Sequence, residues 1–497
     1  MRFIAILIFS GLIFAGAARA QAIAEAGLLR HIEILASDAF EGREPGTLGE
    51  NKTVHYIASQ WSAAGLHPAG EKGSWYAPVS LVERTPDTYR IYFANKGRGK
   101  SVRLRPDEII LRSRSPSFRQ SHMPVVFAGY ADLERDGLSV TGKLVLLPRK
   151  PPEDDDMPDF RNRKLKLIRA GAVGVISVVE DQDRWSRFQR FFQRGSTALA
   201  DPENHADLEG LISFEQFGKL VRQSGLDAET LLADKDAISI VDLGLNADAS
   251  AETQVRSYLS HNVIGKIPGT DPKRGALLFM GHWDHFGICR IEDPLEPGKD
   301  RICNGAVDNA SGISLLIETA KRLSGEGQDR DIYFLATTAE EKGLLGARAF
   351  TDNPPVALEK LIAVFNADTI ALSDNGQEIA VVGPAETGLD KDIGIVAAQE
   401  GREIDRSGKA DAYIKRQDGY VFLELGVPAF MISSAFADEE RLKAFIDGPY
   451  HDVSDEVNDT LELTGAAADA NFHVALGRYF ASTARYPGIA TSGEADN

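Results

Sequence analysis

The chain has 497 residues, of which 43% are hydrophobic and 26% are charged, a balance typical of globular proteins. This excludes a disordered, collagenous or coiled-coil chain, and roughly 150 residues per domain gives about three domains as a first expectation. The net charge of -18, from 73 acidic and 55 basic residues, disfavours nucleic acid as a partner, because phosphate backbones are bound by clustered Lys and Arg.

Residues 1–20 are predicted to be a signal peptide. Arg2 provides the early positive charge, Phe3 to Ala15 is apolar but shorter than the roughly 20 residues that span a bilayer, and Ala18-Arg19-Ala20 fits the cleavage pattern. A membrane anchor is the alternative. Because no later stretch is apolar enough to cross a membrane, we expect an exported protein, periplasmic or secreted, with no stable membrane insertion after leader cleavage.

Residues 21–123 are expected to open the main domain. From Ile23 to about Leu66, apolar residues recur at three- and four-residue steps, which is typical of helices. Gly and Pro at 41–47 divide this stretch into two helices. Short β-like runs follow at 89–93 and 109–111.

Residues 124–251 have a different pattern and are predicted to form a separate, smaller mixed α/β domain. Strands are expected at 125–130, 143–147 and 174–179, and helices at 165–170 and 214–225. The segment 151–159 is a charged, proline-rich loop. A polar run at 246–253 marks the boundary.

Residues 252–485 alternate strands with helices, which predicts a doubly wound, mostly parallel α/β sheet. The expected strands lie at 276–280, 331–336, 361–366, 379–383 and 429–433, and the expected helices at 313–323 and 391–401. Functional residues of such sheets lie at the carboxyl ends of the strands. Residues 486–497 are expected to be a disordered tail.

Histidines and carboxylates follow these strands closely. Each has an ordinary alternative, since a lone His is usually structural, paired Glu residues suit a helix start and Asp308 could only cap a helix. Five such positions at successive strand ends favour a metal site instead. A His and carboxylate set without thiolates suits zinc, or less selectively cobalt or manganese. Two metals sharing one bridging carboxylate need five ligands, and the sequence supplies five: His282, Asp308, Glu341, Asp368 and His451.

Other residues are predicted to assist these ligands. Asp284, two residues after His282, is a candidate to hold the imidazole in its ligating tautomer. Glu340, next to a ligand, is the natural general base for an activated water. Tyr450 is a candidate for stabilising the oxyanion, with ordinary packing as its alternative. His285 is expected in the cleft wall, with a structural role equally open.

The run from His282 to His451 resembles the M28 family of zinc exopeptidases. The matching pieces are Gly-His-Trp-Asp at 281–284, Asn-Gly-Ala-Val-Asp-Asn-Ala-Ser-Gly at 304–312, Ala-Glu-Glu-Lys-Gly-Leu-Leu-Gly at 339–346, Asn-Ala-Asp at 366–368 and Tyr-His-Asp-Val-Ser-Asp-Glu at 450–456. The resemblance implies that Asp308 bridges two Zn2+ ions, with His282 and Asp368 on one and Glu341 and His451 on the other. It also implies Glu340 as the base and a cis peptide between Asp308 and Asn309.

The resemblance extends beyond the ligands. Residues 35–46 look like the opening segment of secreted M28 aminopeptidases, and 124–251 looks like an inserted protease-associated domain. The sequence departs from the family where many relatives carry Ser-Asp-His, since Arg416-Gln417-Asp418-Gly419 stands there. No ligand is lost, but the substrate contacts are expected to differ.

Two cysteines, Cys289 and Cys303, bracket an acidic loop between the first two ligands. In an exported protein we expect a disulfide here, with free thiols or zinc ligation as alternatives. The basic and aromatic run 184–194 is expected to be a solvated helix or lid loop rather than a nucleic-acid patch, and 153–156 a solvated loop, with a calcium site as its alternative.

The predicted function is an exported di-zinc exopeptidase that removes N-terminal residues from peptides. Zinc lowers the pKa of water toward roughly 7, and Glu340 transfers the proton to the leaving amine. One alternative is a glutaminyl-cyclase-like or other amidohydrolase on the same scaffold, for which one zinc could suffice. Another is a non-catalytic binding protein that combines the same two domains.

Overall fold

The computed structural model describes residues 22–96, 101–130, 139–149, 160–180, 182–200, 205–233, 240–290, 297–383 and 388–488. The predicted signal peptide and the charged loop at 151–159 lie outside the described residues. The described part divides into two compact units, unit 1 at 1–77 and 261–497, and unit 2 at 78–260. None of its helices combines the length and apolar character that a bilayer crossing requires.

Unit 1 is built on a mostly parallel sheet in the order β17-β16-β18-β15-β11-β14-β10. The neighbours of β11 and β15 are parallel to them. β10 pairs antiparallel with β14 and β16 pairs antiparallel with β18, whereas β17 is parallel to β16. The strands are β1 (His67–Pro68), β10 (Val241–Ile267, shared with unit 2), β11 (Ala276–His282), β14 (Asp331–Thr337), β15 (Leu361–Asn366), β16 (Glu378–Val382), β17 (Glu403–Ile404) and β18 (Ala429–Ser433), with a separate pair β12 (Gly287–Ile288) and β13 (Ile302–Cys303).

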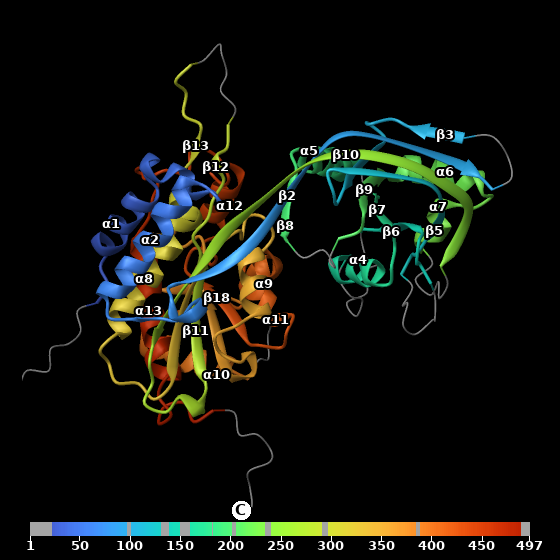
Figure 1. The fold of residues 1–497 in the computed structure, drawn as a ribbon. Coiled ribbons are helices and arrows are strands. Elements are labelled where there is room, and N and C mark those ends of the chain that lie inside the picture. Colours follow the sequence, from blue (N-terminus) through green and yellow to red (C-terminus); the bar gives the residue numbers. More distant parts are fainter. Residues whose placement is uncertain are drawn as a thin grey trace, which may run out of the picture. The chain divides into compact units, whose positions relative to one another are not determined.

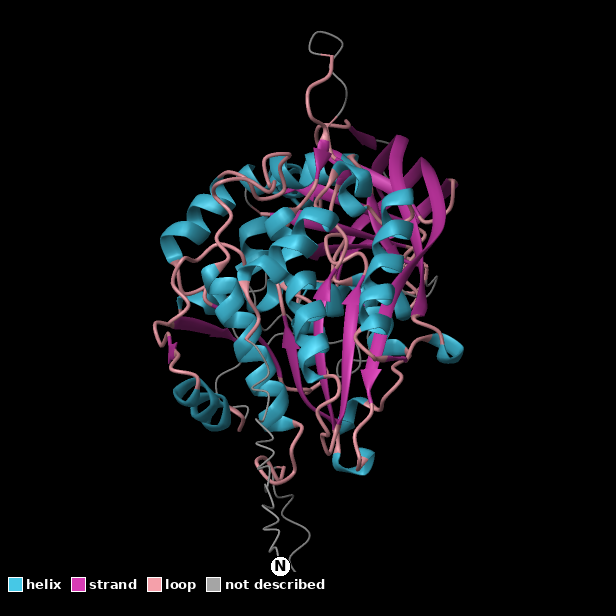
Figure 2. Cartoon of the chain, turned by 90° about the vertical axis from the view of Figure 1, so that its left-hand side faces the viewer, coloured by secondary structure: helices cyan, strands magenta, loops and turns pink. Residues whose placement is uncertain are grey.

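Helices cover both faces of this sheet. Figure 1 shows α1, α2 and α8 on one side of the strands and α9 and α11 on the other. In Figure 2 the first of these sides faces the viewer, and helices lie in front of the strands. The helices are α1 (Glu25–Leu35), α2 (Leu48–Ala63), α8 (Gly312–Leu323), α9 (Leu345–Asp352), α10 (Asp390–Gln399), α11 (Gly419–Leu423), α12 (Glu439–Asp447) and α13 (Thr464–Phe480). Shorter turns are η1 (Asp38–Arg43), η2 (Glu71–Gly73), η4 (Pro272–Arg274), η5 (Ala306–Ser311), η6 (Leu358–Lys360) and η7 (Lys409–Arg416).

The central strands are buried on both faces, which is why they read as unbroken apolar runs. Alternate residues of β11 enter different cores, because successive side chains of a strand point to opposite faces. Phe279 packs with the α1, α8 and α13 side, and Leu278 and Met280 pack with the α9 and α11 side. The predicted α/β class with a mostly parallel sheet is confirmed.

Unit 2 has its own mixed sheet in the order β10-β5-β6-β7-β9-β4, parallel from β5 to β9 and antiparallel at both ends. Its elements are β2 (Tyr76–Asn95), β3 (Ser101–Leu104), β4 (Ile109–Ser113), β5 (Ser117–Phe127), β6 (Leu144–Pro148), β7 (Gly174–Val179), β8 (Ser196–Leu199), β9 (Leu208–Ser213), α4 (Phe160–Arg169), α5 (Gln182–Gln193), α6 (Phe214–Gln223) and α7 (Ala228–Ala233).

The observed unit is wider than the insert expected over 124–251. β4 pairs with β9 and β5 pairs with β10, so strands that precede residue 124 belong to the same sheet. Their pairing partners lie about a hundred residues later in the chain, and no local pattern reveals such partners.

Two other expectations differ in detail. Tyr486, expected to open a disordered tail, is 5% exposed and packs against Phe480 with ring centroids 4.9 Å apart, while residues 489–497 lie outside the described part. The run 184–194 lies largely within α5, where the guanidinium groups of Arg112 and Arg149 lie over the rings of Phe192 and Phe188. Its described aromatic side chains therefore pack within unit 2.

Candidate metal centre and active site

The predicted ligands gather at the carboxyl edge of the unit 1 sheet. Parallel register sets His282, at the end of β11, beside Thr337, at the end of β14, and sets Met280 beside Asn366, at the end of β15. Short connections then carry the other side chains to this edge: Glu340 and Glu341 after β14, Asp368 after β15, Asp308 in η5 and His451 after α12.

A first group of three ligands is buried around His282. Its Nε2 atom lies 3.3 Å from Asp308 Oδ1 and 3.5 Å from Asp368 Oδ1. One ligand atom from each of the three residues falls within 4.8 Å of the others. The peptide bond after Asp308 is cis.

A second group uses the other oxygen of Asp308. His451 Nε2 lies 3.3 Å from Asp308 Oδ2 and 3.1 Å from Glu341 Oε2. Asp308 therefore presents one carboxylate oxygen to each histidine, which is the arrangement of a bridging ligand.

By distance alone, His285 is an alternative to His451 as the histidine ligand of the second group. Atoms of His285, Asp308 and Glu341 also lie within 4.8 Å of one another. The Nδ1 atom of His285 lies 2.8 Å from Glu341 Oε1, the oxygen of that carboxylate that His451 does not contact. His285 is thus suited to orient Glu341, while His451 faces both carboxylates.

These spacings fit zinc. Bonds of about 2.0–2.2 Å to nitrogen and oxygen put neighbouring ligand atoms of a tetrahedral site about 3.3–3.6 Å apart. The His282 and His451 distances to their carboxylates, 3.1 to 3.5 Å, fall in or close to this range. Three carboxylates and two imidazoles, without a thiolate, are also the donor chemistry that zinc accepts.

Asp284 contacts both the predicted ligand His282 and the predicted base Glu340, but its carboxylate does not hold the imidazole as expected. The Nδ1 atom of His282 lies 3.1 Å from the backbone carbonyl of Asp284 and 3.9 Å from its carboxylate. The carbonyl therefore fixes the tautomer, leaving Nε2 for a metal. The Asp284 carboxylate instead accepts a hydrogen bond from the backbone N–H of Glu340 at 3.0 Å, which places it behind the predicted base.

The side chains of the site carry an excess of acidic groups. Burial, with repulsion from Glu341, raises the pKa of Asp284 to about 7. Burial and neighbouring carboxylates raise the pKa of Glu340 well above its usual range. Burial opposes protonation of His451, but hydrogen bonds to Asp308 and Glu341 outweigh it and raise its pKa to about 9. Bound cations would replace these protons.

Two charged residues hold the backbone around the predicted ligands, and the sequence analysis did not indicate these roles. Arg43 is fully buried and donates to the backbone carbonyls of Leu35, Trp283, Asn304 and Gly305. Asp455 accepts hydrogen bonds from the backbone N–H groups of Val307 and Asp308 at 2.9 and 3.0 Å. Both lie in the stretches that resemble the family, but no periodicity or ligand spacing points to their partners.

Gly305 shows how tightly this edge is packed. Its φ of +58° is left-handed, and a Cβ atom there would lie 2.1 Å from the carbonyl oxygen of Asp308. Only glycine therefore fits without moving the bridging ligand.

The disulfide and the tyrosine lie beside the second group. Cys289 and Cys303 are joined, and Cys303 Sγ lies 3.9 Å from the carbonyl oxygen of His451. The ring of Tyr450 stacks on His451, with centroids 3.6 Å apart. Part of the loop between the two cysteines, 291–296, lies outside the described residues.

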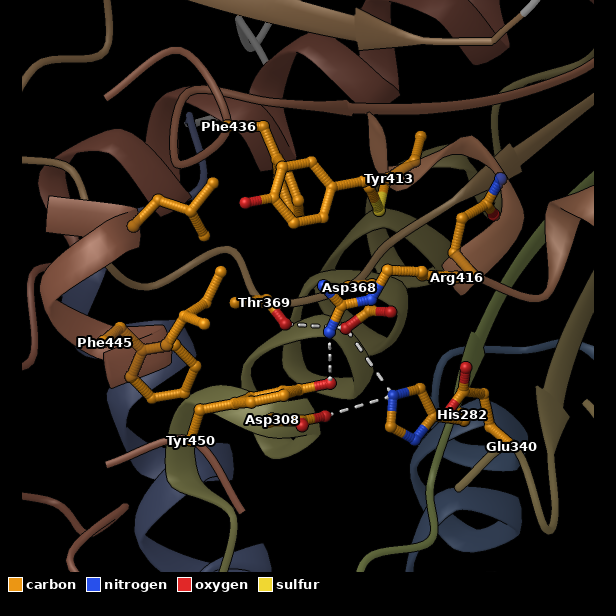
Figure 3. A pocket seen from close by; sticks show the side chains of 14 residues that line it. His282, Asp308, Glu340, Asp368, Thr369, Tyr413, Arg416, Phe436, Phe445 and Tyr450 are labelled. Carbon is orange, nitrogen blue, oxygen red and sulfur yellow. Dashed lines mark hydrogen bonds and ion pairs between the residues drawn. The ribbon is translucent and has the colours of Figure 1, made fainter. Parts of the chain in front are cut away.

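A pocket opens over the first group (Figure 3). One wall carries His282, Asp308, Glu340 and Asp368, together with the hydroxyl of Tyr450. The rest of the lining is largely apolar or aromatic, with two polar residues that come from the departure from the family pattern: Thr369, Tyr413, Arg416, Gln417, Met431, Phe436, Leu442, Phe445 and Ile446.

Comparison with known proteins agrees with this geometry. Residues 262–475 match the model of Peptidase family M28. A stretch of 116 residues is 39% identical to Aminopeptidase YwaD of Bacillus subtilis, covering 23% of this chain and 22% of that protein. Another of 166 residues is 26% identical to the Alkaline phosphatase isozyme conversion protein of Escherichia coli, covering 31% of this chain and 48% of that protein.

The matched stretches thus span about half or less of the length of these curated relatives. Among solved structures, an aminopeptidase from Aneurinibacillus sp. strain AM-1 superposes with a TM-score of 0.52 at 18% identity. The superposition covers 93% of this chain and 95% of that one. This likeness shows a shared fold.

Proposed function

The chain carries a peptidase domain of family M28 over residues 262–475, and from this premise we propose that it is an exported aminopeptidase using two zinc ions. The observation that carries the proposal is the pair of histidine–carboxylate groups that share Asp308. In this assignment His282 and Asp368 would hold one zinc, Glu341 and His451 would hold the other, and Asp308 would be shared by both.

Zinc bound at these ligands supplies Lewis acidity toward water and toward the scissile carbonyl. Glu340 lines the same pocket and is the base. Its carboxylate accepts the proton of the attacking water and returns it to the nitrogen of the leaving amine.

Tyr450 and Asp284 complete the proposed mechanism. The Tyr450 hydroxyl lines the pocket wall above Asp308 and is the donor to the carbonyl oxygen as that atom gains charge (Figure 3). Asp284 acts through others, since its backbone carbonyl fixes His282 and its carboxylate holds the backbone of Glu340.

Export and the identity of unit 2 belong to the same proposal. The leader-like pattern of residues 1–20 supports a periplasmic or secreted location. The insertion of residues 78–260 between two segments of unit 1 supports a protease-associated domain. We expect peptides as substrates and no nucleic-acid partner.

The test uses free and N-blocked dipeptides and an aminoacyl anilide, with and without chelator. We expect cleavage of free but not N-blocked substrates, loss of cleavage with chelator and about two zinc ions per chain by elemental analysis. Glu340→Gln should keep the zinc and lose about 100- to 10,000-fold in kcat.

Several outcomes would count against the proposal. Full activity of Glu340→Gln with two zinc ions bound would overturn the base assignment. Equal cleavage of blocked substrates would overturn the aminopeptidase assignment, and a single zinc with cyclase activity would favour the alternative.

A further inference from the structure

Arg416 brings a positive charge into an acidic pocket. It ends η7 and lines the pocket that also exposes Asp308, Glu340 and Asp368. Figure 3 shows its guanidinium directed toward the Tyr450 hydroxyl. The position belongs to the segment 416–419, where the sequence departs from the pattern of the family it resembles.

Among the described residues, no carboxylate forms an ion pair with this guanidinium. Its polar contact is a long one, from Nη2 to the Tyr450 hydroxyl at 3.4 Å. Its other neighbours are aromatic, since its guanidinium carbon lies 5.4 Å from the ring centroid of Tyr413 and 5.8 Å from that of Tyr450.

The donors of Arg416 favour an anion at this position. Two zinc ions would offset the four carboxylates of Asp308, Glu341, Asp368 and Glu340, and the remaining carboxylates, Asp284 and Asp418, are buried and do not line the pocket. Among the described residues, the side-chain hydrogen bond found for Arg416 is the long one to Tyr450. A guanidinium binds a carboxylate through two parallel hydrogen bonds, a geometry that no other side chain offers.

We propose that Arg416 binds a carboxylate of the substrate and thereby makes the enzyme prefer acidic substrates. This rests on the proposed peptidase function and deepens it. The carboxylate has two possible sources, the side chain of an N-terminal Asp or Glu or the free C-terminus of a dipeptide. The apolar lining at Met431, Phe436 and Leu442 contacts the aliphatic part of the bound residue.

The test compares pairs of substrates that differ only in this charge. Glutamyl and glutaminyl anilides test the side-chain source, and a leucyl dipeptide with its C-terminal amide tests the other. In each arm we compare wild type, Arg416→Gln and Lys415→Gln, a neighbouring exposed cation that does not line the pocket.

For one of the two pairs, wild type should favour the charged member. Arg416→Gln should reduce that preference about tenfold through KM, with kcat nearly unchanged, as expected for the loss of one charge-assisted contact. Lys415→Gln should keep the preference. Arg416→Lys should restore part of it, because the charge returns without the planar fork.

A role for Arg416 in only positioning Tyr450 predicts a different result. All substrates would then lose the same factor and the charged-to-neutral ratios would stay constant, which would overturn the proposal. Absence of any preference in wild type would overturn it as well.

A binding measurement separates this inference from the proposed function. Calorimetry measures the dissociation constants of two proteins, Glu340→Gln and Glu340→Gln/Arg416→Gln. Two ligand pairs are compared on each protein. One pair is a peptide that begins with Glu and one that begins with Gln, and the other pair is a dipeptide and its C-terminal amide. Tighter binding of one charged ligand that depends on Arg416 supports the inference even if wild type hydrolyses nothing, in which case only the peptidase proposal fails. Equal binding overturns the inference.

Discussion

Each unit contains a cluster of buried charges, and the two clusters are balanced differently. In unit 2, Glu209 lies 2.9 Å from Arg112, 3.0 Å from Lys164 and 3.4 Å from His205. Although burial opposes ionisation, these partners hold the pKa of Glu209 well below its usual range. In unit 1, Asp284 and Asp418 are as deeply buried. Asp284 lies 3.9 Å from His282 Nδ1, and the ion pairs found among the described residues do not include Asp418. Burial raises the pKa values of the two carboxyl groups to about 7 and about 6.

The difference separates a structural cluster from a functional one. A buried carboxylate that is paired contributes to the fold, whereas a group of unpaired carboxylates is costly until a cation arrives. The cluster of unit 2 is complete in itself. Under the proposed function, the cluster of unit 1 would be balanced by the metal ions held beside it.

The largest expected effect comes from the bridging ligand. Asp308→Asn should reduce kcat/KM on the order of a thousandfold or more and lower the zinc content below two, because both metal positions lose a shared anion. Elemental analysis and anilide kinetics measure this, with the exposed Asp352→Asn as the control. Retention of two zinc ions and of activity would remove the distinction between the clusters.

Removing the carboxylate of the Glu209 cluster in unit 2 should lower the stability of the protein and leave its catalytic activity unchanged. Glu209→Gln removes the buried carboxylate that Arg112 and Lys164 share, and it should lower the free energy of unfolding by about 3 kcal/mol. Urea denaturation measures this, and the zinc content and kcat of the folded protein should not change. The matched control is Glu215→Gln, an exposed residue paired with Lys219, which should behave like wild type. A large loss of kcat in Glu209→Gln would mean that unit 2 is not merely structural there.

Neutralising an unpaired carboxylate should raise the free energy of unfolding instead of lowering it. The folded pKa of Asp418 is raised to about 6, so its stability contribution is present below about pH 4 and is lost as pH rises through 6. In metal-free protein at pH 8, Asp418→Asn should therefore raise the free energy of unfolding by about 1–3 kcal/mol, with Thr337 still able to donate to residue 418. At pH 4 the two proteins should be nearly equal.

Urea denaturation of chelated protein at both pH values measures this smallest effect, with the exposed Asp411→Asn as the control. If Asp418→Asn lost as much stability at pH 8 as Glu209→Gln, Asp418 would have a stabilising partner. The contrast between the charge clusters of the two units would then be wrong.

The sequence by itself determined the elements and the ligand types. The strands at 361–366 and 429–433 have the predicted bounds, because buried parallel strands are short apolar runs bounded by polar residues. Since such strands end at one edge, the residues after β11, β14 and β15 could be expected to meet. Chain order and residue type predicted that His282, Asp308, Glu341, Asp368 and His451 would meet, and the tertiary structure brings these side chains together.

Only the tertiary structure decided the contacts between distant segments. Arg43 reaches the carbonyls of Asn304 and Gly305, more than 200 residues later, and the backbone carbonyl rather than the carboxylate of Asp284 holds His282. The same holds for the width of unit 2, where β4 pairs with β9. Periodicity reports which face of an element is buried, but hydrogen bonds and ion pairs depend on where side chains meet in space, and that is fixed by packing of the whole chain.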